Sequence, residues 1–468
     1  MRLLLVLLIL LGLPALADET VNDVTGLNPI RVERVLAPTD IEQIVAAVKH
    51  HPGPISIGGG RFSMGGQTAT DGALQLDMRD FDQILEFSAE RREIRVQAGI
   101  TWHAILKYVD PYDLSPQIMQ SYANFTVGGS LSVNVHGRYV GEGPLIGSVR
   151  SIRLVLADGS LVDASPQQNT ELFHGAIGGY GGLGVIVEAT LGLVDNSRIA
   201  RESTVMPLSQ YRAWFDREVR GQSDLVLHNG ILYPDSFDTV RAVSYRRTSA
   251  ALTETARLTP AGRSYHLQQA GIRLTSASRT GRMLREAALD PLLFRGAKVQ
   301  WRNHEASLDV RELEPISGPD FSFVLQEYFV PPAQLERFVG ELARLSEKHQ
   351  ANLINVSIRH AKADPDTLLA WAPEEVFALV LYYRQGSDTT ERTRAAAWTR
   401  ELIDAALACG GRYYLPYQIH ASREQFLAAY PRAPEFFALK QRLDPGYKFR
   451  NRLWDAYYAP SSSISLAR

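Results

Sequence analysis

The sequence predicts an α+β fold with two domains, and three observations lead to this prediction. Short β-branched apolar segments and short amphipathic segments alternate irregularly through residues 34–194, without the regular spacing of a parallel βαβ series. Glycine-dense segments interrupt this region at 54–67, 124–137 and 176–188. Longer apolar segments alternate with helical patterns through 200–405, which predicts a second sheet covered by helices.

The first domain is expected to begin with a helix and short strands. Thr39 and Glu42 form the pattern of a capping box, and apolar residues from Ile41 to Val48 recur at helical spacing. Thr101 is expected to cap a second helix, and Asp158-Gly159 is typical of a hairpin turn. The expected order is a helix from 41, strands 54–57 and 74–78, hairpin 84–98, helix 102–109, hairpin 149–163, helix 171–176 and a strand ending near 194.

The second half contains longer elements. Its expected strands are 321–330, 353–360 and 376–384, and its expected helices are 331–348 and 391–408. Residues 241–302 contain twelve Arg and Lys against three Asp and Glu. Two interpretations of this basic stretch stay open: a solvated insertion, or a contact surface for an anionic membrane or a phosphorylated, lipid-like substrate.

Composition excludes several classes of protein. The chain has 468 residues, 45% of them apolar, which is enough for two or three globular domains. A net charge of −2 gives no electrostatic reason to expect nucleic acid as a partner. Cys409 is the only cysteine, so no internal disulfide and no multi-cysteine metal site can form. The eleven histidines show no metal-binding spacing, and no metal is expected.

The N-terminus has the pattern of a secretory signal peptide. Arg2 precedes an apolar run from Leu3 to Leu13, and Ala15-Leu16-Ala17 is a small-residue cleavage site. We expect residues 1–17 to be removed and the protein to be exported, to the periplasm or outside the cell. An uncleaved anchor is the alternative.

The glycine-dense segments favour a phosphate-bearing cofactor. Glycine allows successive backbone N–H groups to face an anion, and two such segments about 70 residues apart fit a long ligand between them. The first segment lacks the Gly-Lys-Ser/Thr of a Walker loop, and its Gly58, Gly60 and Ser63 do not form a G-x-G-x-x-G fingerprint.

The three segments, with the hairpin 149–163 and the C-terminal stretch 443–451, resemble the vanillyl-alcohol oxidase family, whose FAD domain is called PCMH-type. The alditol oxidase, sugar-lactone oxidase and decaprenylphosphoryl-ribose oxidase branches are most similar. The resemblance implies a two-part FAD-binding domain with an α/β cap domain for the substrate. The implied division is a signal peptide at 1–17, the FAD domain at 18–200, the cap at 201–405 with its basic insertion at 241–302, and a segment at 406–468 that returns to the FAD and active-site region.

The resemblance also implies the residues that contact FAD. In the first segment, backbone amides are expected to bind the pyrophosphate, and the other two segments are expected to line the flavin or adenine. Core packing is the alternative role for the Val127 side chain. The implied residues are Gly58, Gly59, Gly60, Arg61, Phe62, Ser63, Gly65, Thr126, Val127, Gly128, Gly129, Ser132, Asn134, His136, Gly182, Gly184, Ile186 and Tyr414. Many members of the family bond the flavin covalently through a histidine where this chain has Phe62, so non-covalent FAD is expected.

Four residues are candidates for catalysis by the same resemblance. Arg359 matches an arginine of the alditol oxidase cap, and Ser357 stands where that branch has an acidic residue on the same strand face. Tyr417 occupies the place of a lysine, and Tyr417 or His420 is expected to act in its stead, with a structural role open for both.

Together these features predict an exported FAD-dependent oxidase or dehydrogenase that oxidises a CH–OH group of a sugar, sugar lactone, alditol or related compound by hydride transfer to flavin N5. Its partners would be this small substrate and oxygen or another electron acceptor. Two alternatives stay open: a flavin-dependent reductase of a cell-wall sugar, and a non-catalytic flavin- or sugar-binding protein.

Overall fold

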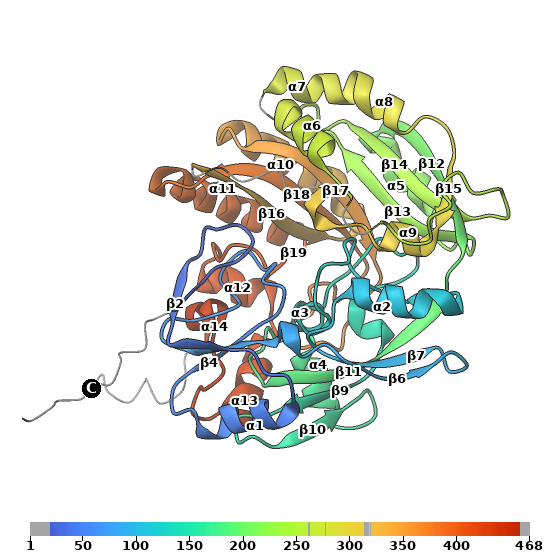
Figure 1. Cartoon of the computed structure of the whole chain (residues 1–468). Helices are drawn as coiled ribbons and strands as arrows, with labels where there is room; N and C mark the ends of the chain where they lie inside the picture. The colour runs from blue at the N-terminus through green and yellow to red at the C-terminus, as the bar shows by residue number, and fades with distance from the viewer. Residues whose placement is uncertain (1–18, 261–262, 277, 313–317, 319, 459–468) are drawn as a thin grey trace, which may run out of the picture.

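The computed structural model describes residues 19–260, 263–276, 278–312, 318 and 320–458. It shows an N-terminal domain and a cap domain, lower and upper in Figure 1, which confirms the predicted α+β class. The predicted signal peptide at 1–17 lies outside the described residues. Within the described part of the chain, no helix is both long and apolar enough to cross a membrane.

In the described part of the chain, the N-terminal domain contains three sheets. A parallel sheet has the order β3 (Arg34–Leu36), β5 (Leu74–Asp77), β4 (Ile55–Gly58). An antiparallel sheet has the order β10 (Leu161–Ala164), β9 (Val149–Val155), β11 (Val185–Asp195), β7 (Glu93–Gln97), β6 (Ile84–Ser88), and β8 (Leu114–Pro116) also pairs with β11. The third sheet is the pair β1 (Glu19–Val21) and β2 (Ile30–Val32). Both predicted hairpins are confirmed.

The cap domain is built on one antiparallel sheet. Its order is β15 (Lys298–Trp301), β12 (Arg198–Pro207), β14 (Thr239–Arg247), β13 (Leu225–Leu232), β17 (Asn352–Ala361), β18 (Val376–Gly386), β16 (Phe321–Val330), β19 (Arg412–Tyr413). Helices cover it on the outside (Figure 1): α5 (Leu208–Glu218), α10 (Leu335–Lys348) and α11 (Thr389–Ala408). The strands and helices predicted after residue 320 are confirmed to within a few residues.

The basic stretch 241–302 forms part of the cap. It supplies β14, a helical region and the edge strand β15, and several of its arginines are paired, such as Arg246 with Asp224 and Arg257 with Asp110. The helical region consists of α6 (His266–Ser276), α7 (Arg279–Leu284), a π-helical turn η4 (Arg285–Leu289) and α8 (Asp290–Leu293), and α9 (Arg302–Ala306) follows β15.

Helix termini mostly follow the sequence signals. The side chain of Thr101 accepts a hydrogen bond from Ala104 N and caps α2 (Trp102–Val109), as predicted. The cap of α1 (Ile41–His50) is Asp40 and not Thr39, because the Asp40 carboxylate accepts from Gln43 N. The glycine segment 124–137 contains the helix α3 (Val127–Val133).

The C-terminal segment returns to the N-terminal domain. After α4 (Thr170–Ala176), the remaining helices are α12 (Arg423–Ala429), α13 (Ala433–Leu443) and α14 (Arg452–Tyr457). Phe449 pairs with Ile55 beside the parallel sheet, and Ser56 Oγ donates to Arg450 O. Lys440 is fully buried, and its Nζ donates to Gly182 O (2.7 Å), Phe449 O (2.9 Å) and Asp444 Oδ2 (3.0 Å). These hydrogen bonds hold the C-terminal segment against the third glycine segment, 176–188.

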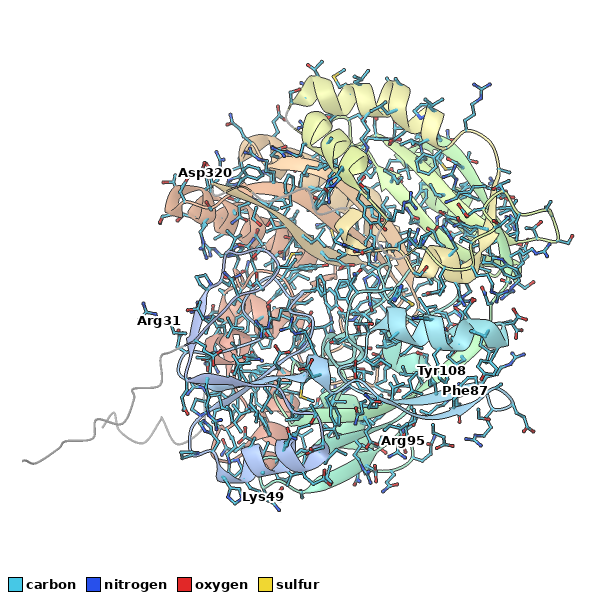
Figure 2. All side chains as sticks on the ribbon, in the orientation of Figure 1. Arg31, Lys49, Phe87, Arg95, Tyr108 and Asp320 are labelled. Atoms are coloured by element: carbon cyan, nitrogen blue, oxygen red, sulfur yellow. The ribbon has the colours of Figure 1, made fainter. Side chains whose placement is uncertain are left out.

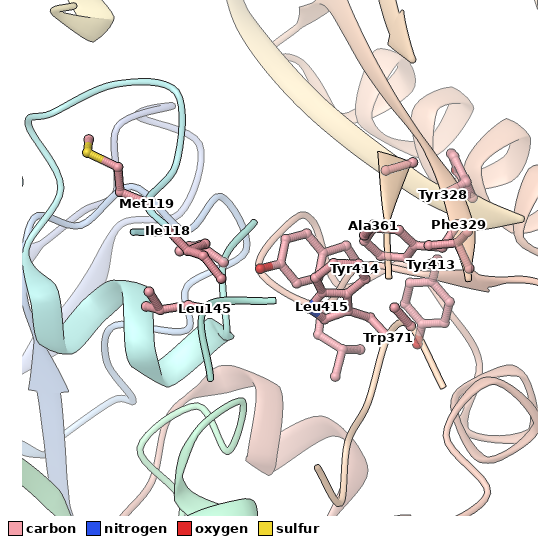
Figure 3. Packing of buried hydrophobic residues seen from close by; sticks show 14 of the residues in the cluster. Ile118, Met119, Leu145, Tyr328, Phe329, Ala361, Trp371, Tyr413, Tyr414 and Leu415 are labelled. Atoms are coloured by element: carbon pink, nitrogen blue, oxygen red, sulfur yellow. The ribbon is translucent and has the colours of Figure 1, made fainter. Parts of the chain in front are cut away.

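A continuous apolar core connects the two domains. Figure 3 shows Ile118, Met119 and Leu145 of the N-terminal domain facing the cluster of Phe329, Trp371 and Tyr414. By contrast, Phe87 and Tyr108 form an edge-to-face pair, 5.5 Å between ring centroids, on the outer side of β6 and α2 (Figure 2). The shared core fixes the cap relative to the N-terminal domain, because interiors of this density deform little.

Candidate active site

A cavity of about 1340 Å³ is lined by residues of both domains. All three glycine segments border it, although they are far apart in sequence. The predicted residues that line it are Gly59, Gly60, Arg61, Phe62, Ser63, Thr126, Gly128, Gly129, Ser132, His136, Gly184, Ile186, Ser357, Arg359, Tyr414 and Tyr417. Gly58, Gly65, Val127, Asn134, Gly182 and His420 are not part of its lining.

The first glycine segment presents unused hydrogen-bond donors. Among the described residues, the backbone N–H groups of Gly60 through Ser63 have no acceptor, and neither does Arg61 Nε. Thr68 Oγ1, also in the lining, is buried without a partner in the described part of the chain. A side chain at position 59 would collide with Thr126 Oγ1, so only glycine fits there. Consecutive free N–H groups form an anion-binding concavity, which fits the pyrophosphate of FAD.

Phe62 stands where the resemblance implies a flavin-linking histidine in many relatives. Its ring stacks on Phe125 with 4.2 Å between centroids and 28° between planes. A phenyl ring has no nucleophilic atom for a bond to flavin. Cys409 is buried and is not part of the lining, so it is not placed for such a bond either.

The second glycine segment reaches the cavity through a helix rather than through free amides. Thr126 Oγ1 accepts from Gly129 N (3.3 Å), and Gly128 N donates to Ala98 O (2.7 Å). Val127 is fully buried in the core. Because these backbone donors already have acceptors, this segment contributes wall surface to the cavity rather than free N–H groups. The helix packs closely on Ala98, since a Cβ at Gly128 would lie 2.9 Å from the Ala98 methyl.

Three predicted contact residues have structural roles instead. Gly65 N donates to Gln67 Oε1 (2.9 Å), which removes it from the free donors of its loop. Asn134 ends α3 in the left-handed conformation, and its Nδ2 donates to Asp364 Oδ2 (3.0 Å). Gly182 packs against Trp454 and accepts from Lys440.

A carboxylate that the sequence reasoning missed lies in the cap half of the cavity. Glu327 is 2% exposed and lines the cavity. Its Oε1 is 2.6 Å from His136 Nε2, and the Tyr417 hydroxyl donates to its Oε2 (3.2 Å). His136 Nδ1 is 3.2 Å from Gly137 O, so both ring nitrogens lie within hydrogen-bond distance of an oxygen.

Sheet register places Glu327 in the same row as Ser357. Ser357 on β17 pairs with Val380 on β18, and Val380 pairs with Glu327 on β16. Directly paired residues point to the same face of a sheet, so serine and carboxylate face the cavity in one row. The available signal was the strand itself, since Glu327 interrupts the apolar face formed by Phe323, Leu325 and Phe329.

Arg359 is a cation without a fixed partner. It lines the cavity two residues after Ser357, and its side chain makes no ion pair or hydrogen bond with any residue in the described ranges. Burial lowers the pKa of its guanidinium and the charge of Arg138 lowers it further, while Glu327 and Tyr417 oppose this. An arginine remains charged under such conditions, so Arg359 offers a positive group to an oxygen of a bound molecule.

The two predicted tyrosines differ in what they contact. Burial raises the pKa of the Tyr417 hydroxyl well above its usual value, and Glu327 raises it further, so this hydroxyl stays protonated and donates. Tyr414 Oη donates to Val133 O (2.8 Å) at the end of α3. In Figure 3, Tyr414 lies beside Trp371, which stacks on Phe329 with 4.3 Å between centroids. Tyr414 thus forms part of the aromatic wall between the domains.

His420 lies away from this cluster. Its carbonyl accepts from Arg400, and its Nε2 is buried without a partner among the described residues. Burial lowers its pKa to about 4, with Arg400 and Arg392 adding to the effect. The residue is therefore neutral near pH 7 and is not placed to act on a ligand in the cavity.

Comparisons with known proteins agree with this site. Residues 32–165 match the family described as FAD binding domain. The chain is similar to L-galactono-1,4-lactone dehydrogenase, mitochondrial, from two plants. It is 27% identical to the Brassica oleracea protein over 42% of this chain and 33% of that protein. It is 28% identical to the Arabidopsis thaliana protein over 42% of this chain and 32% of that protein. The matched part of the chain thus spans about a third of these relatives. Cytokinin dehydrogenase 10 of Oryza sativa subsp. japonica is 24% identical over 92% of this chain and 84% of that protein.

The matched family covers the first two glycine segments, and the free donors of the first segment suit the phosphates of the cofactor that the family binds. Residues 32–165 form a PCMH-type FAD-binding domain of the kind found in FAD-linked oxidoreductases, and FAD is its cofactor.

Proposed function

We propose that the protein is an exported FAD-dependent oxidoreductase that oxidises a CH–OH group of a sugar lactone, sugar, alditol or related hydroxylated compound. The observation that carries the proposal is the cluster of Glu327, Tyr417 and Arg359 in the cavity that the glycine segments border. The lactone dehydrogenases named above make a sugar lactone the first compound to test.

Oxidation of an alcohol requires removal of a hydride from carbon and a proton from oxygen. FAD, when bound, supplies the hydride acceptor. Glu327 is the group that would take the hydroxyl proton, since its carboxylate is an acceptor that faces the cavity. Arg359 would bind the substrate oxygen and stabilise the negative charge that develops there.

Two residues would position Glu327. His136 and the protonated Tyr417 each hold one of its oxygens, so the carboxylate cannot rotate freely. Ser357 lies in the same row of the sheet and would hydrogen-bond a second substrate hydroxyl. Phe62 supports non-covalent attachment of FAD, because the linking histidine is absent at that position.

Export is proposed from the composition of residues 1–17. Sequencing of the mature protein would begin at Asp18 if cleavage follows Ala17. A mature chain that still begins at Met1 would contradict cleavage, and its recovery in the cytoplasm would contradict export.

An anaerobic substrate screen tests the enzymatic proposal. The FAD-loaded protein is mixed with lactones, sugars and alditols, and the absorbance of oxidised flavin is followed. Bleaching by a hydroxylated compound supports the proposal. Reduction by a pyridine nucleotide with no bleaching by any alcohol would favour the reductase alternative, and a flavin that no compound reduces would favour a binding protein.

A further inference from the structure

The helical region of the cap carries a concentration of exposed apolar side chains. Ten large apolar residues are exposed among the described residues, and five of them lie within the eleven positions 283–293. They are Met283, Leu284, Leu289, Leu292 and Leu293, with Leu292 the most exposed at 67%. Single exposed leucines are ordinary on soluble proteins, whereas a contiguous patch marks an interaction site. We call residues 279–298 the helical patch.

Basic residues lie on both sides of the exposed apolar side chains in the sequence. The helical patch contains four arginines and one lysine against Glu286 and Asp290. Asp290 is buried, accepts from Tyr233 Oη (3.0 Å) and pairs with Arg285 (3.4 Å), so it adds no negative charge to the outer surface. Arg279, 74% exposed in its side chain with its Nε 3.9 Å from the mostly buried Asp235, precedes the apolar residues, and the exposed Arg295 follows them. The outer surface is therefore apolar at its centre and positive at both ends.

The helical patch also borders the substrate half of the cavity. Arg285, Leu289, Leu293 and Phe294 line the cavity, whereas Met283, Leu284 and Leu292 are exposed without lining it. Figure 1 shows α7 and α8 at the outer end of the cap, opposite α1 and β10. A surface on which this patch rests would lie next to the cavity and away from the N-terminal domain.

We propose that α7, η4 and α8 dock the protein on an anionic lipid bilayer, with Met283, Leu284 and Leu292 among the acyl chains and Arg279 and Arg295 at the headgroups. Short amphipathic helices with apolar residues between cations bind interfaces in this way. Charge favours the bilayer over a second copy of the chain. A two-fold contact would bring the same cations together across the interface, whereas anionic lipids complement them.

The test places a fluorophore on the full-length, FAD-loaded chain. A probe sensitive to polarity is attached to Leu292→Cys, and a matched probe to Leu161→Cys on β10, where the native residue is 44% exposed at the opposite end of the molecule. Cys409 is buried, and the unsubstituted chain serves as the labelling blank. With vesicles that contain phosphatidylglycerol, the probe at 292 should shift to the blue and be quenched by nitroxide-labelled lipids, while the probe at 161 should do neither.

Two further measurements distinguish an anionic bilayer from a second copy of the chain as the occupant of the helical patch. Arg279→Gln with Arg295→Gln should weaken the lipid titration of the 292 probe about 30-fold, about 5-fold for each cation. A 292 probe that ignores the vesicles, or one that binds neutral phosphatidylcholine equally well, overturns the proposal. If Leu284→Gln with Leu292→Gln converts a lipid-free dimer into monomers, the occupant is a second copy and the proposal is also overturned. None of these readouts depends on substrate oxidation.

Discussion

Replacing Glu327 by glutamine removes a proton acceptor while preserving shape. The amide oxygen can still accept from the Tyr417 hydroxyl, which now lies 3.2 Å from Oε2, and the side chain keeps its place in the row with Ser357. What is lost is basicity, and a general base contributes about 10²–10⁴-fold to a rate. At about 1.36 kcal/mol per factor of ten, this is about 2.7–5.4 kcal/mol of activation free energy.

The substitution should also destabilise the folded protein, because the His136 imidazole loses the carboxylate 2.6 Å away. A hydrogen bond to a charged group contributes about 1.5–3 kcal/mol to stability. The rate of flavin reduction is therefore measured by anaerobic stopped flow at saturating substrate, with bound flavin and thermal unfolding as checks on folding. Asp110→Asn is the matched control: its carboxylate is also buried and accepts from Arg257 Nε (2.7 Å), but lies outside the cavity.

We expect Glu327→Gln to slow flavin reduction by at least about 100-fold and Asp110→Asn to lower stability without a comparable loss of rate. A Glu327→Gln protein that binds FAD and reduces it within about 10-fold of the parent rate would show that this carboxylate is not the base.

Three other predictions follow from named groups. Arg359→Ala should lose substrate-dependent bleaching by about 100-fold or more while FAD stays bound, and Arg359→Lys should recover part of it; an unchanged bleaching rate would exclude this cation from the reaction. Acid precipitation should release FAD into the supernatant, because Phe62 forms no bond to it, and yellow colour in the pellet would contradict this. Burial lowers the pKa of His228 to about 3. The imidazole therefore stays neutral in the folded protein at pH values where the unfolded chain binds a proton with the usual histidine pKa of 6.5. The contribution of this group to the free energy of unfolding should be fully present above that value, and it should fall by up to about 1.4 kcal/mol per pH unit below it. Urea unfolding at several pH values should show a smaller change of the unfolding free energy per pH unit for His228→Gln than for the parent. Equal changes in the two proteins would contradict the assignment.

The sequence predicted the fold well where local signals decide structure. Thr101 caps α2 as expected, and Asp158-Gly159 turns the hairpin of β9 and β10, because both depend on residues adjacent in the chain. The cap at Asp40 shows the limit of such signals, since Thr39 and Asp40 are both suitable caps and only the backbone geometry selects one. Glycine density likewise did not distinguish the loop at Gly60 from the helix α3, whose amides bond to Ala98 and Thr126.

The candidate site was harder to predict because strand pairing assembles it. Glu327 and Ser357 share a row of the sheet only because β18 lies between their strands, and the chain separates them by a complete helix. His136 was expected beside the flavin, and its ring contacts Glu327, which no local pattern links to it. His420, three residues after Tyr417, was an equal candidate in sequence, yet it is buried apart from the cavity.

A structure of the FAD-loaded protein would show whether the glycine segments and Glu327 serve one site. We expect pyrophosphate oxygens within hydrogen-bond distance of the backbone N–H groups from Gly60 to Ser63, and a flavin ring in the same cavity as Glu327 and Arg359. FAD bound with those N–H groups unoccupied, or with its ring in a space separate from Glu327, would contradict it.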